Sequence, residues 1–104
     1  MPAEEYERAQ LLFEAKDYAA AARTLHSLVE SAPENRAARM LLARAYYHSA
    51  QLTRAEGELR TVLEQDPSEA YAHLMLGRTL ERQSREEEAA RHLRLARAMG
   101  IDEG

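Results

Sequence analysis

The chain contains no cysteine and no tryptophan, and it has only four glycines and three prolines among 104 residues. Without cysteine there is no disulfide, no thiolate metal ligand and no cysteine nucleophile. Glycine and proline interrupt helices, so their scarcity leaves long stretches free to be helical. Because alanine, leucine, glutamate and arginine dominate the remainder, and all four are good helix formers, the composition predicts an all-α protein.

A long apolar run and a basic surface are also missing. No apolar stretch approaches the length of a membrane span, and the start of the chain, Met1 to Glu5, is acidic rather than apolar. Acidic residues outnumber basic ones by 18 to 14, and the two signs are interleaved. A protein that binds nucleic acid usually neutralises its phosphates with a basic patch or stripe. We therefore expect a cytoplasmic protein with neither a nucleic acid nor a membrane as its partner.

Thirteen of the fourteen basic residues are arginine. We interpret this bias as the mark of a GC-rich bacterial genome and attach no function to it.

What the sequence does contain is one unit repeated every 34 residues. Five columns share this spacing: Ala21, Ala55 and Ala89; Leu25, Leu59 and Leu93; Ala9, Ala43 and Gly77; Leu12, Tyr46 and Leu80; and Pro33 and Pro67. A period of this length is typical of stacked helix pairs. The small residues should let two helices approach closely, and the leucines of the second column should fill the space between successive pairs.

The period divides the chain, 1–104, into a single domain of three units, 2–35, 36–69 and 70–103. Helices are expected at 3–15, 18–30, 35–49, 52–65, 68–82 and 85–99. A tight turn at Lys16 and Asp17 joins the first two helices, and the other units should repeat it. Asp66, Pro67, Ser68 and Glu69 read as a capped helix start, and Gly100 as a helix stop.

These repeats resemble those of the tetratricopeptide repeat (TPR) family over practically the whole chain. The second unit carries the family pattern in order, with Leu42, Ala43, Tyr46, Ala55, Leu59 and Pro67. Arg8 replaces a leucine in the first unit, and Glu5, Arg39 and His73 stand where the family has tryptophan. The resemblance implies an α-solenoid, in which three helical hairpins form a right-handed superhelix, and a role in binding other proteins.

In TPR arrays the first helix of each unit lines a concave groove. The residues expected to face that groove are Tyr6, Gln10, Phe13, Met40, Arg44, Tyr47, His48, Tyr71, Leu74, Arg78 and Arg82. Aromatic residues and arginine dominate binding hot spots, so we predict a protein partner, held through a peptide or helix whose acidic groups reach Arg44 and Arg78. Packing of Phe13 and Tyr47 against their own hairpins is the competing interpretation.

No pattern for catalysis is present. The sequence has no phosphate-binding loop, no Gly-rich dinucleotide turn, no nucleophile elbow and no H-E-x-x-H. Its histidines, His26, His48, His73 and His92, occupy four different repeat positions, and we interpret each as a surface or rim residue. The prediction is a protein that is not an enzyme, with no catalytic residue, no metal and no cofactor.

Two alternatives to groove binding stay open. No further helix follows the third unit, so Leu76, Leu80, Leu95 and Met99 are expected to leave an apolar end face, through which the protein forms a homodimer or docks onto a larger assembly. The other alternative is a small chaperone for secreted proteins, because three-repeat TPR chaperones serve bacterial secretion systems.

Overall fold

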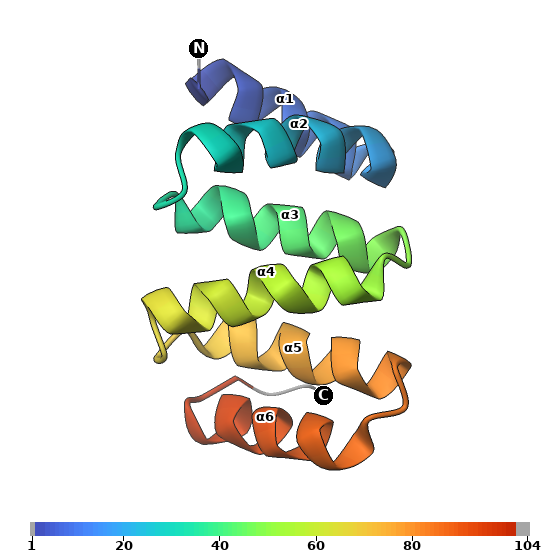
Figure 1. Cartoon of the computed structure of the whole chain (residues 1–104), viewed down its shortest axis with the longest axis vertical. Helices are drawn as coiled ribbons and strands as arrows, with labels where there is room; N and C mark the ends of the chain where they lie inside the picture. Colours follow the sequence, from blue (N-terminus) through green and yellow to red (C-terminus); the bar gives the residue numbers. More distant parts are fainter. Residues whose placement is uncertain (1, 102–104) are drawn as a thin grey trace.

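The computed structural model describes residues 2–101, a range that contains six α-helices and no strand. The helices are α1 (Pro2–Glu14), α2 (Tyr18–Ser31), α3 (Arg36–His48), α4 (Leu52–Gln65), α5 (Ala70–Arg82) and α6 (Glu86–Ala98). Figure 1 shows them following one another along the long axis of the molecule, which measures 39 Å. The predicted all-α solenoid is confirmed, and each helix lies within about two residues of the range expected from sequence.

The turn inside each hairpin has the same backbone geometry. Lys16, Ala50 and Ser84, which are 34 residues apart, have φ values of 64°, 61° and 61°. The residue after each of them donates its backbone N–H to a carbonyl five residues earlier, as Asp17 does to Leu12 at 2.9 Å. This left-handed residue closes the first helix in a Schellman motif and turns the chain into the second helix. Asp17 then caps α2 by accepting the N–H of Ala20 at 3.3 Å.

The columns of small residues form the helix contacts that their spacing predicts. The alanines of both columns are at most 1 % exposed, and Gly77 is also buried. Leu25 and Leu59 are completely buried between successive hairpins. Leu93 is only partly buried, because no hairpin packs over its side of α6 in the described range.

One predicted helix boundary is wrong. The segment from Asp66 to Glu69 does not begin a helix at Pro67; α5 begins at Ala70, with Glu69 as its N-cap. Asp66 instead ends α4 in an extended conformation, which the following proline favours. Its carboxylate accepts the backbone N–H and the hydroxyl of Ser68, at 3.0 and 2.6 Å. The carboxylate therefore stabilises the turn between hairpins and caps no helix.

The predicted helix stop at Gly100 is right. Its φ is 102°, and Ile101 donates its N–H to the carbonyl of Ala96 at 3.0 Å. Glycine adopts this left-handed conformation without the steric penalty of a side chain.

The predicted apolar end face is only half right. Leu95 and Met99 are 43 % and 42 % exposed, but Leu76 and Leu80 are fully buried. These two leucines lie on α5, which packs extensively against α6, so α6 covers them.

The stacking surface of α6 also differs from that of the earlier hairpins. The places filled by Leu28 and Val29 in α2, and by Val62 and Leu63 in α4, hold Ala96 and Arg97 in α6. Ala96 is short and Arg97 is charged, so this surface of α6 differs from the apolar surfaces of α2 and α4, on which the next hairpin packs.

Candidate functional site

The helices form two layers with different spacing. The first helices of the hairpins touch one another, since α3 contacts both α1 and α5. Between α2 and α4, and between α4 and α6, the backbones do not approach as closely within residues 2–101, and long side chains such as Arg60 and Glu88 span the distance from α4 to α6. A stack that is tight on one side and open on the other curves toward the tight side. The concave face is therefore formed by α1, α3 and α5, and furrows open on the convex face between the second helices.

Arg44 lies at the centre of the concave face, between aromatic rings from two other helices. Its guanidinium carbon is 4.7 Å from the ring centroid of Phe13 on α1 and 5.8 Å from that of Tyr71 on α5. Both contacts are within the range of cation–π attraction. Arg44 makes no hydrogen bond or ion pair with any residue from 2 to 101. Its charge is thus held in place while its N–H donors have no acceptor in this part of the chain.

A second cluster surrounds His48 at the end of α3. The His48 ring stacks on Tyr18 with centroids 4.7 Å apart, and it meets Phe13 and Tyr47 edge to face at 5.6 and 5.4 Å. Burial among these rings, followed by the charges of two nearby arginines, lowers the pKa of His48 from its usual 6.5. His48 is therefore neutral at pH 7 and presents an aromatic surface rather than a charge.

Arg82 extends this cluster toward the third hairpin. Its guanidinium carbon is 4.7 Å from the Tyr47 ring centroid, and Nη1 donates to the Tyr47 backbone carbonyl at 3.0 Å. Phe13 likewise contacts Tyr18 of its own hairpin, at 5.1 Å, as well as Arg44 of the next. Phe13 and Tyr47 thus pack against neighbouring side chains and also face the concave side, and a role of either ring in binding stays a prediction.

The remaining predicted groove residues lie apart from these two clusters. Tyr6 is partly buried against the core shared by the first two hairpins, and Met40 against the core shared by the second and third. Gln10 is exposed and Arg78 is partly exposed. Leu74 does not offer the open apolar contact expected of it, because only 9 % of the residue is exposed. It lies beneath the face and can serve only as its floor.

Sequence reasoning missed Tyr18 as a member of the site. The equivalent positions hold Leu52 and Glu86, so no repeated aromatic marked this place. The available signal was the tight turn at Lys16, which brings residues five apart, such as Phe13 and Tyr18, to the same end of the hairpin.

The interpretation of every histidine as a surface or rim residue is wrong for His73. That residue is 7 % exposed, its Nε2 is 3.0 Å from the Pro67 carbonyl, and its Nδ1 is 3.1 Å from Nδ1 of His92. Because a carbonyl can only accept, Nε2 of His73 carries a proton, and in the neutral tautomer its Nδ1 then accepts the Nδ1–H of His92. The buried face of α5 brings the two histidines together although they occupy different repeat positions.

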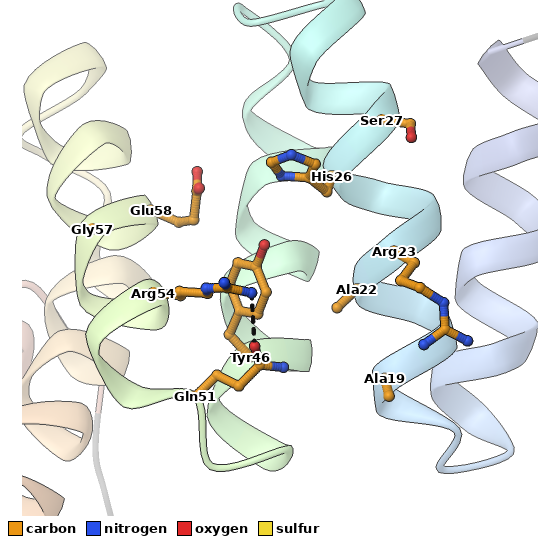
Figure 2. Close-up of a pocket in the computed structure, with 10 residues that line it drawn as sticks. All are labelled: Ala19, Ala22, Arg23, His26, Ser27, Tyr46, Gln51, Arg54, Gly57 and Glu58. Atoms are coloured by element: carbon orange, nitrogen blue, oxygen red, sulfur yellow. Dashed lines mark hydrogen bonds between the residues drawn. The ribbon is translucent and has the colours of Figure 1, made fainter.

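On the convex side, a cleft of 810 Å³ lies between α2 and α4. Figure 2 shows Tyr46 of α3 at its base, with His26 on the α2 side and Arg54 on the α4 side. Nothing in the sequence pattern singled out this place, because it depends on the separation of two helices that the chain does not join directly.

Within residues 2–101, no three histidine, aspartate or glutamate side chains are grouped as metal ligands. None of the six helices in that range is both long and apolar enough to cross a membrane.

Residues 12–78 match the family model described as "Tetratricopeptide repeat". Two similar solved structures are of MamA. One, from Desulfovibrio magneticus RS-1 and beginning at its residue 41, is 27 % identical with a TM-score of 0.86, and the match covers 91 % of this chain and 54 % of that chain. The other, a MamA RS-1 double mutant, is 26 % identical with a TM-score of 0.89, and the match covers 95 % and 56 %. This chain therefore spans about half the length of these proteins.

A third structure is YrrB, described as a TPR protein with an unusual peptide-binding site. It is 24 % identical with a TM-score of 0.92, and the match covers 98 % of this chain and 53 % of that chain. At this identity the similarity speaks for the fold alone. No curated protein matches the sequence.

Proposed function

Because this chain belongs to the tetratricopeptide repeat family, we propose that it is a non-enzymatic interaction module. Its concave face binds a peptide or helix segment of a partner protein. The description of YrrB as a peptide-binding TPR protein supports this general role.

The observation that carries the proposal is the setting of Arg44. A guanidinium placed between Phe13 and Tyr71, without an acidic partner in residues 2–101, has already lost part of its side-chain freedom. An acidic side chain that binds it meets a preorganised donor, so less entropy is lost on binding. The surrounding rings exclude water and offer apolar contact to the neighbouring residues of the ligand.

The proposed ligand is therefore a segment that presents an aspartate or glutamate to Arg44 and apolar side chains to the flanking rings. Tyr71 contacts it on the α5 side, and Phe13, Tyr47 and His48 contact it toward the end of α3. Tyr6, Gln10, Met40, Arg78 and Arg82 extend the same face, with Leu74 below it.

The test is selection of binders from a displayed library of random peptides, followed by affinity measurements on the wild type and on Arg44→Gln. We expect acidic residues to be enriched in the selected peptides. Hydrogen bonds to a charged group contribute about 1.5–3 kcal/mol, so Arg44→Gln should weaken binding by about tenfold or more. Arg94→Gln is the matched control, because Arg94 is exposed on α6, outside the concave face. Peptides that bind Arg44→Gln as tightly as the wild type would refute the proposal.

The exposure of Leu95 and Met99, at 43 % and 42 %, favours a second candidate function, self-association through α6. A substitution such as Leu95→Glu separates the two functions. It should abolish a dimer in sedimentation experiments and leave peptide binding at Arg44 unchanged.

A further inference from the structure

The cleft between α2 and α4 is a place where the fold leaves open space on its convex side. Its volume is 810 Å³, its walls are α2 and α4, and its base is the side chain of Tyr46 from α3 (Figure 2). The backbones of the two wall helices do not approach each other within residues 2–101, whereas each packs on α3. The cleft is thus closed from below by the inner layer and open to solvent from outside.

The base of the cleft carries a polar group without a partner. Tyr46 is 6 % exposed, and its hydroxyl makes no hydrogen bond with any residue from 2 to 101. Figure 2 shows the hydroxyl directed into the open space, near His26 and Glu58. Burial, and then the charge of Glu58, raises the pKa of Tyr46 above 10.0, so the hydroxyl keeps its proton and can donate it in a hydrogen bond.

The core has no need of this hydroxyl. The equivalent positions in the other two units hold Leu12 and Leu80, which fill the same place with apolar side chains alone. The hydroxyl oxygen itself is not enclosed, since among the described residues the only fully buried side-chain polar atom without a partner is Nε of Arg39. Water can therefore bond the Tyr46 hydroxyl in the open cleft, and an acceptor on a ligand can take the place of that water.

The unpaired charge around the cleft is positive. Arg54 lies with its guanidinium carbon 6.0 Å from the Tyr46 ring centroid, and it bonds only the neutral amide of Gln51, at 3.0 Å. Arg23, on the rim, has no ion pair in the described range. The one carboxylate that lines the cleft, Glu58, is already paired with Arg39 at 2.7 Å. The cleft therefore has a hydroxyl donor, on Tyr46, and two guanidinium groups, on Arg23 and Arg54, that have no acidic partner among the described residues.

The next furrow along the convex face, between α4 and α6, differs in this respect. There Arg60 and Arg85 are both paired, with Glu56 and Glu88, at distances from 2.7 to 3.0 Å. Unpaired positive charge is therefore a property of the first furrow and not a general consequence of the repeat.

The α4 wall of the cleft includes a glycine that the fold does not require. Gly57 lies in the middle of the helix, where glycine is unfavourable, and a Cβ built on it would meet no atom within 4 Å. Packing inside the chain therefore does not exclude a side chain at this position, and Arg23 and Arg91 occupy it in the other two units. The missing side chain lets another polypeptide approach the α4 backbone.

We propose that this cleft is a second binding site, which takes an aspartate or glutamate side chain from an exposed segment of a partner protein. The carboxylate accepts hydrogen bonds from the Tyr46 hydroxyl and from Arg54, and the segment lies along the bare surface around Gly57. The site is on the opposite side of the molecule from Arg44, so it does not depend on the function proposed for the concave face.

Two synthetic peptides test the proposal, a Gly-Ser-rich decapeptide with two central glutamates and the same peptide with glutamines. NMR titration of the ¹⁵N-labelled protein reports the place of binding. The Gly57 amide and the Arg54 Nε–H mark the cleft, and the Arg44 Nε–H marks the concave face. We expect the glutamate peptide to shift the cleft signals, with an affinity that falls as salt is added, and the glutamine peptide to leave them unchanged.

Tyr46→Phe supplies the decisive variant, because it removes one oxygen atom and keeps the ring. We expect it to bind the glutamate peptide about tenfold more weakly, as for the loss of a hydrogen bond to a charged group. Ser31→Ala, which removes a hydroxyl at the end of α2 that does not line the cleft, should bind as the wild type does. The unfolding midpoint of Tyr46→Phe should be unchanged or raised, which would exclude misfolding as the cause.

Three results would overturn the proposal: equal binding of the two peptides at the cleft, unchanged affinity of Tyr46→Phe, or shifts at Arg44 without shifts at Gly57. The last result would leave the concave face as the site for acidic groups. If Arg44→Gln bound the selected peptides as tightly as the wild type, the function proposed for the concave face would be refuted and the proposal for the cleft would be unaffected. The two proposals can therefore fail separately.

Discussion

Two glycines in helix interiors should respond differently to the same substitution. Gly77 of α5 is packed against α6, and a Cβ built on it would lie 2.6 Å from Cδ2 and 2.7 Å from Cγ of Leu93, and 3.2 Å from the Ala89 carbonyl oxygen. A Cβ on Gly57 of α4 would meet nothing within 4 Å. Alanine therefore has room at Gly57 and none at Gly77 unless Leu93 moves.

The size of the effect follows from two contributions. Alanine is more favourable than glycine in a helix interior by about 1 kcal/mol, and this gain applies equally to both sites. Overpacking a tight contact costs about 1–3 kcal/mol, and this cost applies only at Gly77. Gly57→Ala should thus raise the free energy of unfolding by about 1 kcal/mol. The free energy of unfolding of Gly77→Ala should be lower than that of Gly57→Ala by about 1–3 kcal/mol.

Urea and thermal unfolding of the wild type and both variants measure this difference. For a domain of this size 1 kcal/mol corresponds to about 4–8 °C in the unfolding temperature. Adding Leu93→Ala to Gly77→Ala should reduce the penalty, because the smaller side chain makes room for the new methyl group, and a double-mutant cycle isolates that coupling. Equal stability of Gly77→Ala and Gly57→Ala would contradict this reasoning. It would mean that Leu93 turns outward at little cost, and that its contact with Gly77 does not set the spacing of α5 and α6.

Three other predictions concern stability. The free energy of unfolding should decrease as the pH falls from about 7 to 5, because burial, then His73 and nearby arginines, lower the pKa of His92 below the 6.5 of the unfolded chain. His92→Gln should reduce this pH dependence, and His26→Gln should leave it unchanged. Ala50→Gly should stabilise the protein by about 0.5–1 kcal/mol in urea unfolding, since Ala50 has a φ of 61°. An unchanged or lower midpoint would contradict that prediction. Glu56→Gln should destabilise it by about 1–2 kcal/mol, because the carboxylate accepts hydrogen bonds from three side chains. Exposed Glu64→Gln should stay within about 0.5 kcal/mol of the wild type.

The sign of the pH prediction follows from which state binds protons more readily. A histidine whose pKa is lowered in the folded protein is protonated first in the unfolded chain, so its contribution to stability is fully present above the unfolded pKa of 6.5 and is lost as the pH falls from there through the lower pKa of the folded state. The pKa of His48 is lowered for similar reasons, so part of the slope should persist in His92→Gln. A slope that is the same in both proteins would mean that the pair with His73 does not control it.

The sequence alone determined the elements, their order and the contact of the small residues within a hairpin. A period of 34 residues fixes which small residues face each other, because two helices joined by a short turn have only one way to bury the same repeated stripe. The same reasoning placed Phe13, Arg44 and Tyr71 on one face, since helical spacing decides the side on which a residue lies.

Tertiary structure decided the distances and angles between neighbouring helices, which the sequence period does not specify. The curvature of the stack opened the cleft above Tyr46, because the second helices separate where the first helices touch. The covering of Leu76 and Leu80 by α6 and the meeting of His73 with His92 depend on how far and at what angle neighbouring helices pack. A repeat pattern gives each residue a direction around its own helix, but the distance to the next helix is set by the volumes of all the side chains between them.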